Sequence, residues 1–291
     1  MSDRVALVED LVYDVGLHKG EDSAFYLAKG YRVVAFEANP DLIAECKQRF
    51  AAEIVAGRMR IIEGAITDSS ESTVRFYVYP EAGWGTTSTE WDSLNSSAGE
   101  AKPVDVPAVN FSDTLRATGI PSLMKIDVEG ADRVCLEALL NFEQRPQSLS
   151  IEANPHYTDA KGLDSGFELL QRLGYDRFAI VQQASIPGSE IATRTLDGQP
   201  LSFRFEAGAS GAFGSDIGPW MDSASARARY KRLFFSSRLI TPLIWRWRRH
   251  GSIGLGFLNW VAAHLPQRGG TGWYDTHAAR STAMDPPTFL N

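Results

Sequence analysis

The segment LVYDVGLHKGEDSAFYLAKGYRVVAFEANP, residues Leu11–Pro40, predicts how this chain folds. It contains an apolar run over 11–13, a glycine turn over 15–20, a helix over 23–29 and a second apolar run over 31–36. A strand, a turn, a helix and a second strand of these lengths are typical of the front half of a parallel nucleotide-binding sheet. The segment therefore predicts a ligand site at the turn.

The residue types in the turn indicate which kind of ligand it binds. Gly16 and Gly20 allow a tight turn and a close approach of the ligand to the backbone, and the helix that follows directs its free N–H groups there. Glu37 ends the second strand about 20 residues after the first glycine, where doubly wound folds place an acid that binds a ribose. These features favour a nucleoside with a charged tail. The alternative is a tight turn without a ligand.

The spacing of the glycines bears on the identity of the nucleoside. Dinucleotide sites carry G-x-G-x-x-G, whereas this turn has Asp14 before the first glycine and lacks the third. A carboxylate at that position would repel a pyrophosphate but suits an ammonium group, so the pattern favours S-adenosylmethionine over NAD. His18, inside the turn, is expected to contact the carboxylate of the cofactor or the substrate; the alternative is simple turn packing.

The rest of the chain continues to alternate between strands and helices. Strands are predicted over 59–66, 73–79, 104–109, 123–128, 147–153, 177–181 and 201–205, and helices over 41–52, 111–118, 131–142 and 164–173. The last two strands are expected to pair as an antiparallel hairpin. This order predicts an α/β, Rossmann-like doubly wound sheet that is mostly parallel with a last antiparallel strand. The segment 83–99, which contains Trp84, is expected to form an ordered lid that contacts the substrate.

Composition and charge exclude several classes of protein. The chain has 291 residues, a formal net charge of −7 and two cysteines, which suits a reducing compartment rather than a disulfide framework. The N-terminus carries acids where a signal peptide would need an apolar core, and no apolar run is long enough for a membrane span. A cytoplasmic protein is therefore expected.

Three motifs together resemble the FkbM-type methyltransferases. They are the opening YDVG-x-HKGEDS-x-FYL-x-KG-x-RVVAFEANP, then LMKIDVEGAD, whose KIDVEG (Lys125–Gly130) is the most specific part, then SGAFG before Gly-Pro-Trp. The resemblance covers residues 10–220. It implies a class I S-adenosylmethionine-dependent methyltransferase fold and usually O-methylation of a hydroxyl. It also implies that the cofactor lies at Asp14, Gly16, Gly20 and Glu37, with Asp127 near the methyl group. The sequence departs from the family pattern at Leu17-His18, where Ala-Asn is common.

The remaining candidate residues also lie at strand ends or helix starts. Ser23 and Ala65 complete the expected cofactor contacts. Glu129 is a candidate substrate contact or a helix cap. Glu152, Asn154 and His156 alternate after a strand, so an extended backbone would place them on one side, where they could orient a hydroxyl and remove its proton. A hydrogen-bonded cluster at the strand end, or a divalent metal site, is the alternative.

Among these groups, His156 is the first choice as the general base, because a histidine ionises near neutral pH. Asp127 is the second choice, and Glu152 completes the catalytic set.

The C-terminal region differs in composition from the rest of the chain. Ser223–Tyr274 contains nine Lys or Arg residues, several tryptophans and no Asp or Glu. Basic residues mixed with tryptophan favour a helix on an anionic membrane surface. The alternative is a helical cap packed on the acidic core, or a subunit interface of a homo-oligomer. Nucleic acid is not expected, because no recognition motif accompanies the charge.

The sequence as a whole predicts a cytoplasmic O-methyltransferase, with possible peripheral contact at the inner face of the membrane. Residues 1–220 are expected to form the methyltransferase domain and 221–291 a basic, mostly helical extension. The expected cofactor is S-adenosylmethionine, without a predicted metal. The expected acceptor is a small molecule or glycolipid, namely a hydroxyl of a sugar, glycolipid or polyketide-like metabolite. Two alternatives remain: an NAD-dependent oxidoreductase, and a catalytically silent cofactor-binding scaffold that docks on membranes.

Overall fold

The structure is a computed structural model, and it describes residues 2–79, 84–87, 101–128, 130–153, 160–233 and 274–281. Most of the segment 83–99 and of the basic region after residue 233 therefore lies outside the described residues. In the described ranges, no helix is long and apolar enough to cross a membrane.

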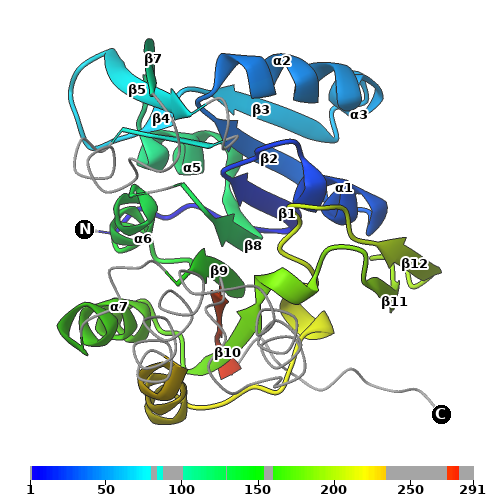
Figure 1. The fold of residues 1–291 in the computed structure, drawn as a ribbon, viewed down its shortest axis with the longest axis vertical. Helices are drawn as coiled ribbons and strands as arrows, with labels where there is room; N and C mark the ends of the chain where they lie inside the picture. Colours follow the sequence, from blue (N-terminus) through cyan, green and yellow to red (C-terminus); the bar gives the residue numbers. More distant parts are fainter. Residues whose placement is uncertain are drawn as a thin grey trace, which may run out of the picture.

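A seven-stranded sheet forms the centre of the molecule, in the order β10-β13-β9-β8-β1-β2-β3 (Figure 1). Neighbouring strands from β3 to β9 pair in parallel, and β13 is antiparallel to both of its neighbours. The predicted doubly wound, mostly parallel sheet with one antiparallel strand is confirmed, and with it the class I architecture that the resemblance implies. The strands are β1 (Leu7–Val15), β2 (Arg32–Glu37), β3 (Met59–Glu63), β8 (Ile120–Ile126), β9 (Ser148–Glu152), β10 (Arg177–Gln182) and β13 (Tyr274–Ala279).

The antiparallel strand comes from an unexpected part of the chain. The predicted pairing of 177–181 with 201–205 is wrong, because β10 pairs with β13, while β12 (Pro200–Arg204) forms a separate hairpin with β11 (Glu190–Arg194). The sequence of β13, YDTHAA, is largely polar and has no strand pattern, but all six of its residues are buried. These residues fall within the predicted extension 221–291, so part of that extension completes the central sheet.

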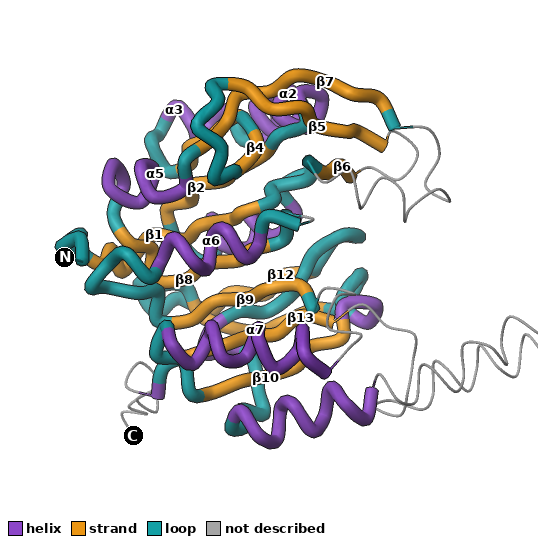
Figure 2. Tube along the Cα trace, turned by 90° about the vertical axis from the view of Figure 1, so that its left-hand side faces the viewer, coloured by secondary structure: helices purple, strands orange, loops and turns teal. Residues whose placement is uncertain are grey.

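Helices cover both faces of the sheet, as Figures 1 and 2 show together. On one face, α1 and α2 contribute Phe25 and Cys46 to a buried core. On the other face, α6 and α7 contribute Leu136 and Phe167 to the larger core. Asn39 begins α2 by accepting a hydrogen bond from the Asp41 N–H, with Pro40 at the first helical position. The helices are α1 (Glu21–Ala28), α2 (Pro40–Arg49), α3 (Ala51–Val55), α5 (Phe111–Thr118), α6 (Asp132–Leu139) and α7 (Ala160–Arg172).

A small second sheet covers one end of the large one. It has the order β4-β7-β5-β6, with β4 (Ala65–Ile66), β5 (Thr73–Tyr79), β6 (Trp84–Thr86) and β7 (Lys102–Val109). The predicted single strand 59–66 is therefore divided at Gly64, where φ is 132° and a Cβ would clash with the backbone of Pro107. The division turns Ala65 away from β3 and toward the small sheet.

The start of the basic region packs on the core. Residues 223–233 are helical. Within them, Arg227 donates to Asp164 at 3.2 Å and to Gln171 at 2.8 Å, and Lys231 lies 3.8 Å from Asp164. Two of the nine basic residues thus pair with α7, as the cap alternative requires; the remainder of the region, 234–273, lies outside the described residues.

Candidate active site

A cavity of about 420 Å³ lies at the carboxyl ends of the central strands, a size typical of small-molecule sites. The glycine turn after β1, the ends of β2 and β8, and the small sheet all contribute to its lining. Five residues predicted to form the site line it: Gly16, His18, Glu37, Ala65 and Asp127.

The glycine turn has the tight, positive-φ conformation that its sequence predicts. Gly16 has a φ of 94°, and a Cβ there would clash with the backbone oxygen of Asp127. Gly20 has a φ of 81°, and a Cβ there would clash with the ring of Phe50. Gly16 is therefore required for the close approach of β8 to the turn. Gly20 is explained by packing against Phe50 and does not itself line the cavity.

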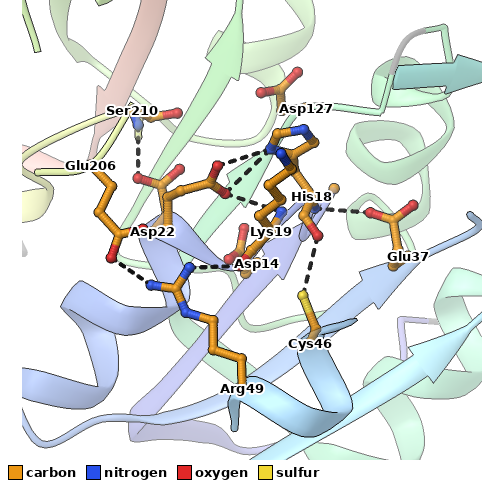
Figure 3. A network of polar contacts seen from close by, with 12 residues as sticks. Asp14, His18, Lys19, Asp22, Glu37, Cys46, Arg49, Asp127, Glu206 and Ser210 are labelled. Atoms are coloured by element: carbon orange, nitrogen blue, oxygen red, sulfur yellow. Dashed lines mark hydrogen bonds and ion pairs between the residues drawn. The ribbon is translucent and has the colours of Figure 1, made fainter. Parts of the chain in front are cut away.

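Contacts from α2 hold the turn in place. The Cys46 thiol donates to the carbonyl of His18 at 3.2 Å, and Arg49 donates to the carbonyl of Lys19 at 2.9 Å and to Glu206 at 2.7 Å (Figure 3). His18 has a φ of 51°, which non-glycine residues rarely adopt. The structure around the turn thus maintains a conformation that the turn alone would not prefer.

Glu37 is oriented by backbone groups at the end of β2. One carboxylate oxygen accepts from the N–H groups of Ala38 at 2.9 Å and Asn39 at 2.8 Å. The other accepts from the His18 N–H at 2.9 Å (Figure 3). Burial raises the pKa of Glu37, and these three donors oppose that effect. A carboxylate can accept about four hydrogen bonds. Glu37 therefore keeps capacity for a hydroxyl in the cavity.

His18 forms a second pair beside Glu37. Its ring nitrogen Nδ1 lies 3.0 Å from Oε1 of Glu21, and Glu21 also accepts from the Lys19 N–H at 3.1 Å. The hydrogen bond to Glu21 raises the pKa of His18. Burial opposes ionisation of Glu21, but the hydrogen bond from His18 and those from backbone groups hold the pKa of Glu21 below its usual value. The pair therefore places a protonatable imidazole on the cavity wall.

Asp14 and Ser23 lie behind the cavity wall. Asp14 is 1% exposed and does not line the cavity. The Ser23 hydroxyl donates to its Oδ2 at 2.7 Å, and burial raises the pKa of Asp14 to about 7. Neither of these two predicted cofactor contacts is among the residues that line the cavity.

Lys125 connects the residues at the base of the cavity, and sequence reasoning did not identify its role. Its ammonium lies 3.2 Å from Asp22, 3.4 Å from Asp127 and 3.8 Å from Asp14. Burial acts to lower the pKa of Lys125, but the carboxylates of Asp127, Asp22 and Asp14 outweigh it and raise the pKa well above its usual value. A lysine inside the apolar run LMKIDV was the signal in the sequence.

The small sheet forms part of the cavity wall. Phe76 of β5 and Gly85 of β6 line the cavity, together with Thr87, which follows β6. β6 lies within the segment 83–99, for which a lid was predicted. The side chain of Trp84 and most of the segment 83–99 lie outside the described residues.

The candidate catalytic residues are only partly described. The side chain of Asp127 is 21% exposed on the cavity wall. Glu152 ends β9 and pairs in register with Asp275 of β13, a buried acid that sequence reasoning missed because β13 was not recognised. Glu129, Asn154 and His156 lie outside the described residues, so their placement remains a prediction. Among the described residues, no group of three or more His, Cys, Asp or Glu side chains could hold a metal ion.

Comparison with solved structures gives several remote likenesses. A methyltransferase FkbM from Methylobacillus flagellatus is 20% identical, with 60% of this chain and 41% of that chain covered and a TM-score of 0.38. A precorrin-6y C5,15-methyltransferase from Geobacter metallireducens is 15% identical, with 67% and 75% covered and a TM-score of 0.32. A putative O-methyltransferase from Klebsiella pneumoniae is 12% identical, with 68% and 74% covered and a TM-score of 0.34. At these TM-scores the likenesses do not bear on function.

Comparison with sequences identifies the family. No curated protein matches the chain. The model of the methyltransferase FkbM domain matches residues 14–177, which is more than half of the chain and includes the glycine turn, Glu37 and the KIDVEG motif. This chain belongs to the FkbM methyltransferase domain family.

Proposed function

We propose that this methyltransferase uses S-adenosylmethionine and transfers its methyl group to a hydroxyl of a sugar, glycolipid or polyketide-like metabolite. The observation that carries the proposal is one cavity that joins two ends of different chemistry. Glu37 and the glycine turn form one end, and the acidic groups around Lys125 form the other.

The donor groups of the cavity fit this cofactor. Glu37 keeps acceptor capacity for a ribose hydroxyl, and Gly16 brings backbone to the cavity without a side chain. Glu21, Asp22 and Asp127 give the wall an excess of carboxylates over the single ammonium of Lys125. Such a wall favours a ligand that carries positive charge. S-adenosylmethionine is such a ligand, and when bound it supplies a methyl group activated by a sulfonium.

Methyl transfer requires little acid–base chemistry from the protein. The hydroxyl oxygen forms a bond to the methyl carbon as the bond from that carbon to sulfur breaks, which yields a methyl ether and S-adenosylhomocysteine. The hydroxyl proton passes to a base on the protein. The chain must therefore align the hydroxyl, exclude water and accept one proton. His156 remains our first candidate for the base and Asp127 our second, with Glu152 and Asn154 orienting the hydroxyl and Glu129 and Trp84 contacting the acceptor.

Calorimetric titration of the protein with S-adenosylmethionine, S-adenosylhomocysteine and NAD tests the cofactor. We expect both adenosyl ligands to bind and NAD not to bind, because the turn lacks the third glycine of dinucleotide sites. Binding of NAD without a response to S-adenosylhomocysteine would instead identify an oxidoreductase.

Incubation with methyl-labelled S-adenosylmethionine and a panel of sugars, glycolipids and polyketide-like alcohols tests the reaction. We expect label to appear as a methyl ether on at least one acceptor class. Label on carbon or nitrogen would contradict O-methylation. Binding of the cofactor without transfer to any acceptor would favour the silent-scaffold alternative.

A further inference from the structure

Lys125 is a charged residue in the middle of a buried strand. It belongs to β8, whose other residues are apolar, small or proline, and Lys125 is 5% exposed. Burying an ammonium is costly unless carboxylates and hydrogen bonds compensate it. Its position therefore needs an explanation beyond packing.

The ammonium of Lys125 joins three elements at the base of the cavity. It lies 3.2 Å from the Asp22 carboxylate on α1 and 3.4 Å from the Asp127 carboxylate after β8. It also lies 3.8 Å from the Asp14 carboxylate on β1 and 3.4 Å from the carbonyl of Gly16. One Asp14 oxygen has no hydrogen-bond partner among the described residues, and it is the one nearest Lys125. A single cation thus compensates carboxylates that come from three separate elements.

Further titratable groups face the same cluster. Asp275 on β13 accepts from Ser150 at 3.3 Å, and Ser150 is the register neighbour of Lys125 on β9. Glu21 and Tyr26 of α1 also interact electrostatically with Lys125. Among the described residues, Lys125 is the only ammonium or guanidinium that pairs with Asp14, Asp22 or Asp127, so the acids of the cluster outnumber it.

Carboxylate oxygens are ligands that divalent cations prefer in proteins, but no group of three or more acidic side chains among the described residues is arranged to hold a metal ion. Mg²⁺ and Ca²⁺ need oxygen ligands at about 2.0–2.6 Å. The carboxylates here lie 3.2–3.8 Å from the nitrogen of Lys125, which is within the range of ion pairs with an ammonium. The cluster is therefore arranged around the lysine.

We propose that Lys125 is the internal counter-ion of this cavity and takes the place of a divalent cation, so that cofactor binding requires no metal. Lys125 is a positioning residue that holds the carboxylates of Asp22 and Asp127 on the cavity wall. The identity of the cofactor rests on the proposed function, whereas the counter-ion role can be measured without any ligand.

Replacement of Lys125 by methionine removes the charge and keeps much of the volume. Burial raises the pKa of Asp14 to about 7, and loss of the ammonium raises it further. A carboxyl group whose folded pKa lies above its unfolded pKa lowers the stability of the fold as pH rises from the unfolded value to the folded value. The wild type should therefore stop losing stability from Asp14 near pH 7, whereas Lys125→Met should continue to lose it above pH 7.

Thermal unfolding without ligand, from pH 5 to pH 9, measures this difference. We expect the gap in Tm between wild type and Lys125→Met to widen above pH 7, by roughly 3 °C per unit of added pKa shift. Lys125→Arg should restore most of the wild-type profile. Lys47→Met is the control, because Lys47 forms an exposed ion pair with Glu63 and does not line the cavity. The difference in Tm between wild type and this control should stay constant from pH 5 to pH 9. A constant difference for Lys125→Met as well would overturn the proposal.

A second arm concerns the metal. Calorimetry with S-adenosylhomocysteine should give the same affinity for wild type before and after chelation with EDTA, and with added Mg²⁺ or Ca²⁺. Loss of binding on chelation, restored by either ion, would overturn the proposal. If the wild type does not bind S-adenosylhomocysteine under any condition, the proposed function fails, and the ligand-free pH series still decides the role of Lys125.

Discussion

Replacement of Glu37 tests whether the strand-end acid binds the ribose. Its carboxylate accepts three backbone hydrogen bonds, from His18, Ala38 and Asn39. Glu37→Ala would leave three N–H groups without their acceptor, at about 1–3 kcal/mol of stability for each one that stays buried. Glu37→Gln keeps the size of the side chain and one oxygen acceptor, so it is the better variant for measuring binding.

The effect on binding follows from the loss of charge. A hydrogen bond to a charged group is worth about 1.5–3 kcal/mol and a neutral one about 0.5–1.5 kcal/mol. The difference of about 1–1.5 kcal/mol corresponds to a roughly 5- to 13-fold weaker affinity for S-adenosylhomocysteine in Glu37→Gln. Glu63→Gln is the matched control, because Glu63 is the register neighbour of Glu37 on β3 but pairs with Lys47 and does not line the cavity.

Calorimetry with S-adenosylhomocysteine and its 2′-deoxy analogue separates a direct contact from a general disturbance. In the wild type, the deoxy analogue should bind more weakly. In Glu37→Gln that penalty should shrink, and in Glu63→Gln it should match the wild type. An equal penalty in wild type and Glu37→Gln would show that Glu37 does not contact the ribose hydroxyl and would refute this reasoning.

Four further outcomes are expected. Asp127→Asn should reduce methyl transfer by about 10² to 10⁴ and cofactor affinity much less; full activity on an identified acceptor would remove Asp127 from the reaction. Gly16→Ala should abolish cofactor binding or folding, because its Cβ meets backbone, whereas Gly57→Ala, at a φ of 69° with open space around it, should cost only backbone strain in an unfolding assay. Asp14→Asn should lose less stability than wild type between about pH 4 and pH 7, because the pKa of Asp14 is about 3.9 in the unfolded chain and about 7 in the folded one; an unchanged pH profile would contradict this. The region 223–274 should co-sediment with anionic vesicles at low salt and release at high salt; no sedimentation at low salt would favour the cap or subunit interface.

Local sequence was sufficient to predict the glycine turn and the acid at the end of β2. Gly16, Gly20 and Glu37 lie within one β–α–β unit, so turn chemistry and strand length alone determine their relation. The caps of α2 and α5 are equally local features, because Asn39 and Asn110 each accept a hydrogen bond from the first turn of the helix that follows.

Contacts between distant segments could not be predicted in the same way. β13 joins β9 and β10 only through pairing across the chain, and its polar sequence carries no strand pattern. The cluster around Lys125 requires α1, β1 and β8 to meet, which no single segment encodes. The division of the predicted strand at Gly64 likewise depends on contact with Pro107. In each case, the local sequence pattern is compatible with more than one arrangement, and tertiary packing determines which one forms.

A crystal structure with S-adenosylhomocysteine tests the proposed cofactor site most directly. We expect the ligand in the cavity between the glycine turn and the small sheet, with a ribose hydroxyl hydrogen-bonded to Glu37 and the amino-acid end toward the carboxylates around Lys125. A ligand bound elsewhere, or a ribose without contact to Glu37, would contradict this expectation.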